Sequence, residues 1–215
     1  MDQVLIPYSM PGGEFLIRPQ DPEQVFGRVA GGLAWPAHGN RGFLVVLAEE
    51  ARTDPAFNVK HVHLVYEPSE EEGSLIHLDN LLRAALRAMR ACSAGRWFAP
   101  RLEKSAQLVR FNREQAQLRQ PQVRPVQPEA NPSFEHYASL VRSRIHERKT
   151  LHFGKSAIPA KLSLLPSDCS AEQFEDHPEI TALFFALAGL ELIGSSGRSS
   201  RDIQGTAPAD RTGGY

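Results

Sequence analysis

The chain is poor in cysteine and lacks any long apolar segment. Its two cysteines, Cys92 and Cys169, are too few for a disulfide framework and do not have the spacing of a metal-binding pair. The first eleven residues lack the basic start and long apolar core of a signal peptide. The most apolar stretch, residues 180–193, is too short to span a bilayer and contains Glu191. These absences predict a cytoplasmic protein with reduced thiols.

The formal net charge of -1 hides a strong segregation of charge along the chain. Residues 1–82 carry five basic and twelve acidic side chains, whereas residues 83–149 carry fourteen basic and five acidic ones. A basic middle segment favours contact with a polyanion; the alternative is an ordinary solvated helix face. The candidate nucleic-acid-binding residues are Arg83, Arg87, Arg90, Arg96, Arg101, Arg110, Arg113, Arg142 and Arg144.

The strongest structural signal is the segment from Gly42 to Glu50, an apolar run that begins with glycine and ends with two carboxylates. A continuous apolar run of this length predicts a strand buried on both faces, at the centre of the sheet. Residues 61–67 follow at hairpin distance as a second strand. The glycines and prolines of residues 1–41 predict an extended N-terminal arm with short edge strands, because proline is excluded from the centre of a sheet.

Helical periodicity begins at Leu78, where apolar residues recur at steps of three and four up to Cys92. Strands and helices then alternate, which predicts an α/β domain with a mixed β-sheet flanked by α-helices over residues 42–193. Residues 194–215 have little to bury and are expected to form a disordered tail. The further segments are expected to be strands at 96–99, 122–126 and 150–153, and helices at 102–118, 133–149, 158–165 and 180–193.

Three segments carry a family resemblance: the apolar strand from Leu44 to Glu50, the segment from Arg96 to Ala99 with the following helix that contains Asn112, and the acidic start of the last helix, residues 175–183. In these places the chain resembles the RNase H-like nuclease domain of large terminase subunits from tailed phages. The resemblance covers roughly residues 30–193. It implies an RNase H-like fold and metal-dependent cleavage of duplex DNA during packaging. It also implies a separate packaging ATPase or other phage proteins as partners.

Nucleases of this kind require carboxylates that converge on two cations, about 4 Å apart, which activate water and stabilise the leaving oxygen. We expect Glu49, Glu67 and Asp176 to be the catalytic ligands of Mg²⁺ or Mn²⁺. Ordinary strand-end and helix-start acids are the alternative, since a helix N-terminus favours acids in any case. The full set of candidate metal ligands is Glu49, Glu50, Glu67, Asp176 and Glu179.

Two departures from the family pattern favour a module without activity. Pro100 follows the segment after which the family places an aspartate, and Thr181 stands where the family tends to carry an acid. The alternative to a nuclease is therefore a catalytically inactive RNase H-like module for DNA binding or phage assembly. A protein-interaction domain with no nucleic-acid role is a third hypothesis.

Two smaller motifs bear on ligands. His61 and His63 alternate on one face of a predicted strand, where they could bind a metal or reach a phosphate, although an exposed strand face is the interpretation we favour. Gly154-Lys155-Ser156 has the form of half a phosphate loop. The glycine that such a loop requires five positions earlier is Lys149, so the motif fails and the sequence predicts no nucleotide binding.

Overall fold

The computed structural model describes residues 4–11, 13–36, 41–55, 58–68, 75–94, 96–100, 105–126, 139–164 and 177–202. The strands are β1 (Ile6–Met10), β2 (Gly13–Arg18), β3 (Asp21–Ala34), β4 (Phe43–Asp54), β5 (Val59–Tyr66), β6 (Trp97–Phe98), β7 (Pro125–Val126) and β8 (Leu151–His152). The helices are α1 (Leu78–Cys92), α2 (Ser105–Gln117), α4 (Ile158–Leu164), α6 (Pro178–Asp202) and the π-helix η2 (Ser143–Glu147). No helix in these ranges combines the length and the apolarity needed to cross a bilayer.

Within the described residues, the strands form one mixed, largely antiparallel sheet with the order β1-β2-β3-β4-β5-β8. Neighbours from β1 to β5 are antiparallel, as short hairpin connections require. The C-terminal half of β3 has a second neighbour, because β6 pairs parallel with it and β7 pairs parallel with β6. β8 is parallel to β5 at the far edge. The molecule is thus an α/β protein.

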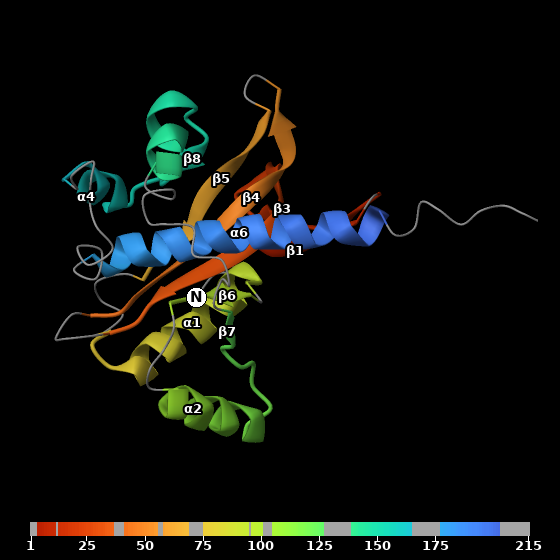
Figure 1. The fold of residues 1–215 in the computed structure, drawn as a ribbon. Coiled ribbons are helices and arrows are strands. Elements are labelled where there is room, and N and C mark those ends of the chain that lie inside the picture. The colour runs from red at the N-terminus through yellow and green to blue at the C-terminus, as the bar shows by residue number, and fades with distance from the viewer. Residues whose placement is uncertain are drawn as a thin grey trace, which may run out of the picture.

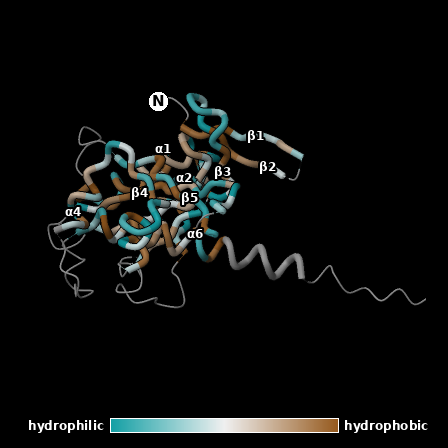
Figure 2. The backbone as a smooth tube through the Cα atoms, turned by 90° about the horizontal axis from the view of Figure 1, so that it is seen from above, coloured by the Kyte–Doolittle hydropathy of each residue, from teal (hydrophilic) through white to brown (hydrophobic). Residues whose placement is uncertain are grey.

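Helices cover both faces of the sheet. α6 crosses one face along β3 and β4, whereas α1 packs on the other face against β4 and β5, with α2 beyond it (Figure 1). The view from above shows the β1–β2 hairpin projecting from the body of the molecule (Figure 2). Two hydrophobic cores therefore lie on opposite faces of one sheet: the α1 core between α1 and the sheet, and the α6 core between α6 and the sheet.

The predicted central strand is confirmed as β4, which lies between β3 and β5. Its side chains alternate between the two cores: Leu44 and Val46 pack on the α1 side, whereas Val45 and Leu47 pack on the α6 side. All four are fully buried. Burying one such side chain contributes about 1.5–3 kcal/mol, which explains why the apolar run is continuous here.

The prediction for the N-terminal arm is wrong over residues 21–34. These residues form β3, the longest strand, which is paired on both sides and buried from Ala30 to Ala34. The Gly31-Gly32 pair does not break this strand. A Cβ on Gly31 would lie 2.4 Å from the Trp97 ring, and a Cβ on Gly32 would lie 1.9 Å from the carbonyl oxygen of Ala182, so the glycines admit close neighbours.

The later elements follow the predicted order, with some differences at their ends. Helix α1 has the predicted bounds, and β5, β6, α2, β7, β8 and α4 lie where strands and helices were expected. Residues 133–138 of the helix expected over 133–149 lie outside the described residues. Residues 139–142 are helical, and the helix ends in the π-helix η2. α6 continues to Asp202, so the prediction of a disordered tail is wrong for residues 194–202, while residues 203–215 lie outside the described residues.

Candidate functional site

Glu49, the first expected metal ligand, lies on the α6 side of β4 and is largely buried. Its Oε1 atom lies 3.1 Å from Arg28 Nη2 and 3.7 Å from Lys60 Nζ. The Arg144 guanidinium is also within electrostatic range; burial lowers its pKa and the Glu49 charge opposes that shift. Because cations of the protein already surround Glu49, its charge is neutralised without a metal.

Glu50 faces the other way, since successive strand residues point to opposite faces. Its Oε1 atom lies 2.7 Å from His63 Nε2 and 3.3 Å from the side-chain nitrogen of Gln24. The two adjacent carboxylates that end the apolar run therefore belong to different layers of the molecule. The sequence alone could not distinguish this arrangement from a shared site.

The remaining expected ligands are also separate from one another. Glu67 accepts a hydrogen bond of 2.8 Å from Ser156 Oγ, and Glu179 forms an ion pair with Lys161 at the start of α6. Asp176 lies outside the described residues. Among the residues that are described, no group of three or more His, Cys, Asp and Glu side chains could hold a metal ion. The structure does not bring the four described acids together, and the catalytic set with Asp176 stays a prediction.

Pro100 stands where the terminase nuclease family places an aspartate, and the paired residues of β3 and β6 beside it contain no carboxylate. The carbonyl oxygen of Pro100, at the end of β6, accepts a hydrogen bond of 2.7 Å from Trp35 Nε1. On β3, the positions paired with β6 are Gly31 and Gly32. The junction of these two adjacent parallel strands therefore carries glycine, aromatic residues and proline, and no carboxylate.

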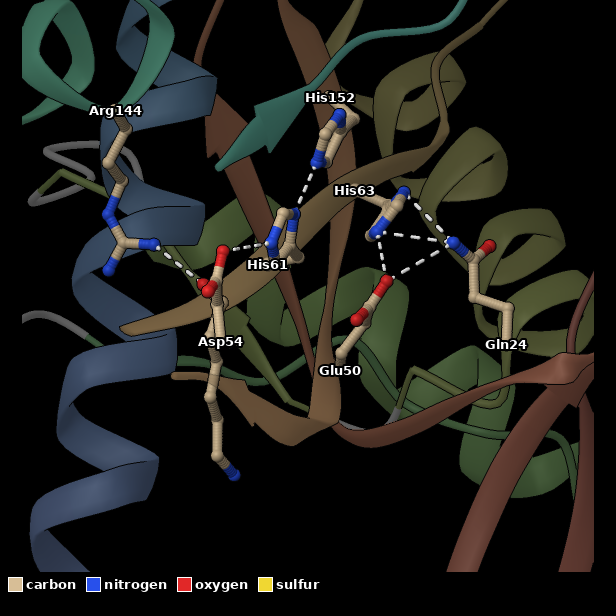
Figure 3. Close-up of polar contacts among 8 residues, drawn as sticks. Gln24, Glu50, Asp54, His61, His63, Arg144 and His152 are labelled. Carbon is tan, nitrogen blue, oxygen red and sulfur yellow. Dashed lines mark hydrogen bonds and ion pairs between the residues drawn. The ribbon is translucent and has the colours of Figure 1, made fainter. Parts of the chain in front are cut away.

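The structure brings together a histidine cluster, made of His61, His63 and His152, on the α1 side of β5 and β8 (Figure 3). His152 stacks on both others, with ring centroids 5.0 Å from His61 and 4.6 Å from His63. The expectation that His61 and His63 form an exposed strand face is wrong for His63, which is 9% exposed. Three imidazoles thus pack against one another at this edge of the sheet, with His63 buried and the other two half-buried.

The hydrogen bonds of the cluster fix its tautomers. Asp54 Oδ2 lies 3.1 Å from His61 Nε2, and a carboxylate only accepts, so this nitrogen carries the proton. In neutral His61 the Nδ1 atom is then an acceptor, and His152 Nε2 donates to it at 2.7 Å. By the same logic, His63 Nε2 donates to Glu50, and His63 Nδ1 accepts from the Gln24 amide.

Electrostatics keep two of these rings neutral. Burial lowers the pKa of His63 to about 4, which outweighs the opposing hydrogen bond with Glu50. Burial also lowers the pKa of His152, and the neighbouring His61 adds to that shift. At neutral pH His63 and His152 therefore take part in the network as uncharged hydrogen-bonding groups.

A pocket of about 570 Å³ opens beside the cluster, and we call it the β5–β8 pocket. Its volume is within the range of small-molecule sites. Arg18 and His152 were not predicted as site residues, because their contacts with β5 depend on strands far apart in the chain. The pocket is lined by Arg18, His63, Leu64, Val65, Tyr66, Glu67, His152, Phe153, Gly154, Lys155 and Ser156.

The candidate arginines separate into two groups. Arg142 and Arg144 are half-buried around η2, on the α6 side, where Arg144 donates to the Lys60 carbonyl oxygen at 3.4 Å. Arg101 lies outside the described residues, and Arg96 is exposed just before β6. The other group occupies the outward sides of α1 and α2 and is called the arginine surface: Arg83, Arg87, Arg90, Arg110 and Arg113.

Comparison of the chain with protein-family models, curated proteins and solved structures finds no match. Function is therefore inferred from the chain's own residues.

Proposed function

We propose that the chain is an RNase H-like module that binds the phosphate backbone of nucleic acid, with duplex DNA as its expected ligand, and does not cleave it. The observation that carries the proposal is the arginine surface. On α1, Leu81, Leu82 and Ala85 face the core, whereas Arg83 and Arg90 are exposed. A helix with such segregated faces presents its guanidinium groups together on one side.

The charge around this surface is strongly one-sided. Residues 78–126 contain ten basic and three acidic side chains. Within the surface, Arg110 Nη2 lies 3.7 Å from Asp79, and Arg90 donates to Gln120. Arg83 and Arg113 are exposed. Guanidinium groups pair with phosphate oxygens in a planar, two-bond geometry, so this surface suits a phosphate backbone better than any specific base sequence.

The topology supports the RNase H-like part of the proposal. β3, β4 and β5 form an antiparallel meander, and the first strand of that meander also has β6 and then β7 parallel beside it. This is the arrangement that we expect of an RNase H-like sheet. The same topology supports binding without cleavage, because β3 and β6 carry no carboxylate where they meet, and Glu49 is neutralised by Arg28 and Lys60.

The second candidate is the Mg²⁺- or Mn²⁺-dependent terminase-type nuclease that the resemblance implies. The strand order favours it as much as it favours the inactive module. Its catalytic set would be Glu49, Glu67 and Asp176. For Glu49 to bind a metal, its contacts with Arg28 and Lys60 would have to be exchanged for the cation, which costs the free energy of those ion pairs.

Binding of a fluorescent DNA duplex tests the proposal when it is measured at about 50 and 200 mM salt, because each lost phosphate contact lowers the salt slope by about 0.9. The test variant replaces three exposed arginines by glutamine: Arg83→Gln, Arg90→Gln and Arg113→Gln. Its charge-matched control replaces exposed cations elsewhere: Arg52→Gln, Arg148→Gln and Lys149→Gln. We expect the test variant to bind at least ten-fold more weakly with a reduced slope, and the control to bind like the parent protein.

Equal weakening of both variants, or no binding by the parent protein at low salt, would refute the arginine surface as the binding site. Plasmid nicking in the presence of manganese distinguishes the two candidates. We expect no nicking. Nicking that Glu49→Gln abolishes would instead establish the nuclease.

A further inference from the structure

The β5–β8 pocket is formed by β2, β5, β8 and the turn after β8, none of which contributes to the arginine surface. We propose that this pocket binds a phosphomonoester of nucleotide size: either a free nucleoside monophosphate or the phosphorylated end of a nucleic-acid strand. This inference is independent of backbone binding on α1 and α2, and either can fail alone.

Two cations, Arg18 and Lys155, line the pocket against one carboxylate, that of Glu67. The charge of Glu67 is already partly satisfied, since it accepts a hydrogen bond of 2.8 Å from Ser156 Oγ. Ser156 Oγ in turn accepts from the backbone nitrogen of Ile158 at 3.1 Å. The pocket therefore keeps a positive excess that an anion can neutralise.

Arg18 is held in place by packing, and not all of its donors are used. Its guanidinium carbon lies 5.6 Å from the centre of the Phe26 ring, and Phe26 is completely buried. Phe26 also meets His63 edge to face, with ring centroids 5.5 Å apart. The Arg18 Nε atom is buried and has no hydrogen-bond partner within the described residues. This buried nitrogen is closed to solvent, so a ligand in the pocket would be bound by the charge of the guanidinium group and not through Nε.

The turn after β8 positions Lys155 at the pocket wall. Gly154 has a φ of 59°, and a Cβ there would meet nothing within 4 Å. The glycine is therefore required for its left-handed backbone conformation and not for a close contact. The turn is closed by a hydrogen bond of 3.1 Å from the Ser156 nitrogen to the Phe153 carbonyl oxygen. This geometry is a tight turn, which agrees with the absence of a P-loop.

The volume and the remaining wall favour a nucleotide over a bare phosphate ion. Tyr66, which is half-buried, lines the pocket beside the two cations, whereas Leu64 and Phe153 pack into the core under α6 and Val65 packs into the core under α1. An aromatic ring at the pocket wall suits a nucleobase, which every nucleotide carries. The charge of the lining argues against a cation as the ligand, because Arg18 and Lys155 outnumber Glu67 there.

Calorimetric titration of the full chain with adenosine 5′-monophosphate tests the proposal, with adenosine as the probe that lacks only the phosphate. Lys155→Gln is the test variant. Lys149→Gln, an exposed lysine before β8, is the charge-matched control. We expect Lys155→Gln to weaken binding of the monophosphate by about ten- to hundred-fold, as the loss of a charge-assisted contact predicts. Lys149→Gln should leave it unchanged.

A second pair of probes identifies the source of the phosphate: a short single-stranded oligonucleotide with a 5′-phosphate and the same oligonucleotide with a 5′-hydroxyl. Preference for the phosphorylated strand that Lys155→Gln removes supports a strand end, and binding of the monophosphate alone supports a free nucleotide. The proposal is overturned if adenosine binds as well as its monophosphate, if no phosphorylated probe binds at millimolar concentration, or if the two lysine variants behave alike. Loss of backbone binding in the arginine variant would leave these titrations unaffected.

Discussion

Gly32 on β3 lies directly beneath the backbone of α6, so close that a Cβ atom on it would stand 1.9 Å from the carbonyl oxygen of Ala182. The nearest obstacle is backbone, which cannot rotate away as a long side chain could. One glycine thus sets the distance between the central sheet and the helix that covers it. This close approach also allows Ala30 and Ala34, on the same strand, to be buried in the α6 core.

Gly32→Ala should therefore destabilise the protein by about 3 kcal/mol or more, because overpacking against a rigid neighbour forces the helix outward. Gly27→Ala is the matched control in the same strand, since a Cβ at Gly27 would meet Ala51 Cα only at 3.4 Å. Urea unfolding of both variants measures the difference. Similar unfolding midpoints for Gly32→Ala and Gly27→Ala would contradict the close contact between Gly32 and the backbone of α6.

The sequence predicted the elements whose signals are local. The three- and four-residue spacing from Leu78 to Cys92 identified α1 with its actual bounds, and the run before Glu49 identified β4. β3 was missed because the glycines and prolines of residues 1–41 are breakers by local rules. The tolerance of Gly31 in a central strand depends on Trp97 of β6, and that of Gly32 depends on α6, about 150 residues further along the chain.

The candidate site was less predictable than the fold. His63 and His152 are neighbours only because β8 adds to the edge of β5, and nothing local to either histidine indicates that pairing. Glu49 and Glu50 looked like one acidic site. Their separation follows from strand alternation, which places one against Arg28 and the other against His63.

Stability should fall as the pH falls from about 6.5 to about 4, the interval between the ordinary pKa of histidine and the lowered pKa of His63. Over this interval the unfolded chain binds a proton that folded His63 does not, so protonation favours unfolding. The contribution of neutral His63 to the free energy of unfolding is fully present above pH 6.5, and it amounts to at most about 3 kcal/mol. The half-buried His152, whose pKa burial also lowers, shifts stability in the same direction.

Urea midpoints at neutral pH and at about pH 5 measure this effect. His63→Gln should lower the stability at neutral pH and flatten the pH dependence. His146→Gln, at an exposed position, should follow the parent curve. If the stabilities of His63→Gln and of the parent protein fall equally between neutral pH and about pH 5, His63 is not the cause of the pH dependence.

Glu49→Gln should reduce stability by about 1–2 kcal/mol, since Arg28 and Lys60 are partly exposed and water screens part of the lost attraction. Arg28 also donates to the Leu190 carbonyl oxygen of α6 at 3.3 Å, so the loss should loosen the contact between that helix and the sheet. Glu114→Gln on the exposed side of α2 is the control. A structural role predicts the same loss with and without added magnesium. A loss that appears only when magnesium is present would indicate a metal ligand.

The side-chain amide of Asn112 on α2 forms hydrogen bonds with both backbone polar groups of Val123, just before β7. Its Nδ2 atom donates to the Val123 carbonyl oxygen at 2.7 Å, and its Oδ1 atom accepts from the Val123 nitrogen at 3.0 Å. Val123 is fully buried, so no water would replace these bonds. Asn112→Ala should cost about 2 kcal/mol, because it leaves a buried donor and a buried acceptor without partners.

Hydrogen exchange at the Val123 amide provides the sharper readout. The amide should exchange at least ten-fold faster in Asn112→Ala, while amides within β4 should change only by the global loss of stability. Gln107→Ala, at an exposed position of the same helix, should change neither exchange rate.

Because Asn112 links α2 to the β7 edge of the sheet, its loss should also weaken binding of the nucleic-acid backbone by Arg110 and Arg113, without affecting the β5–β8 pocket. Unchanged exchange at Val123 would show that the side-chain amide does not hold this segment.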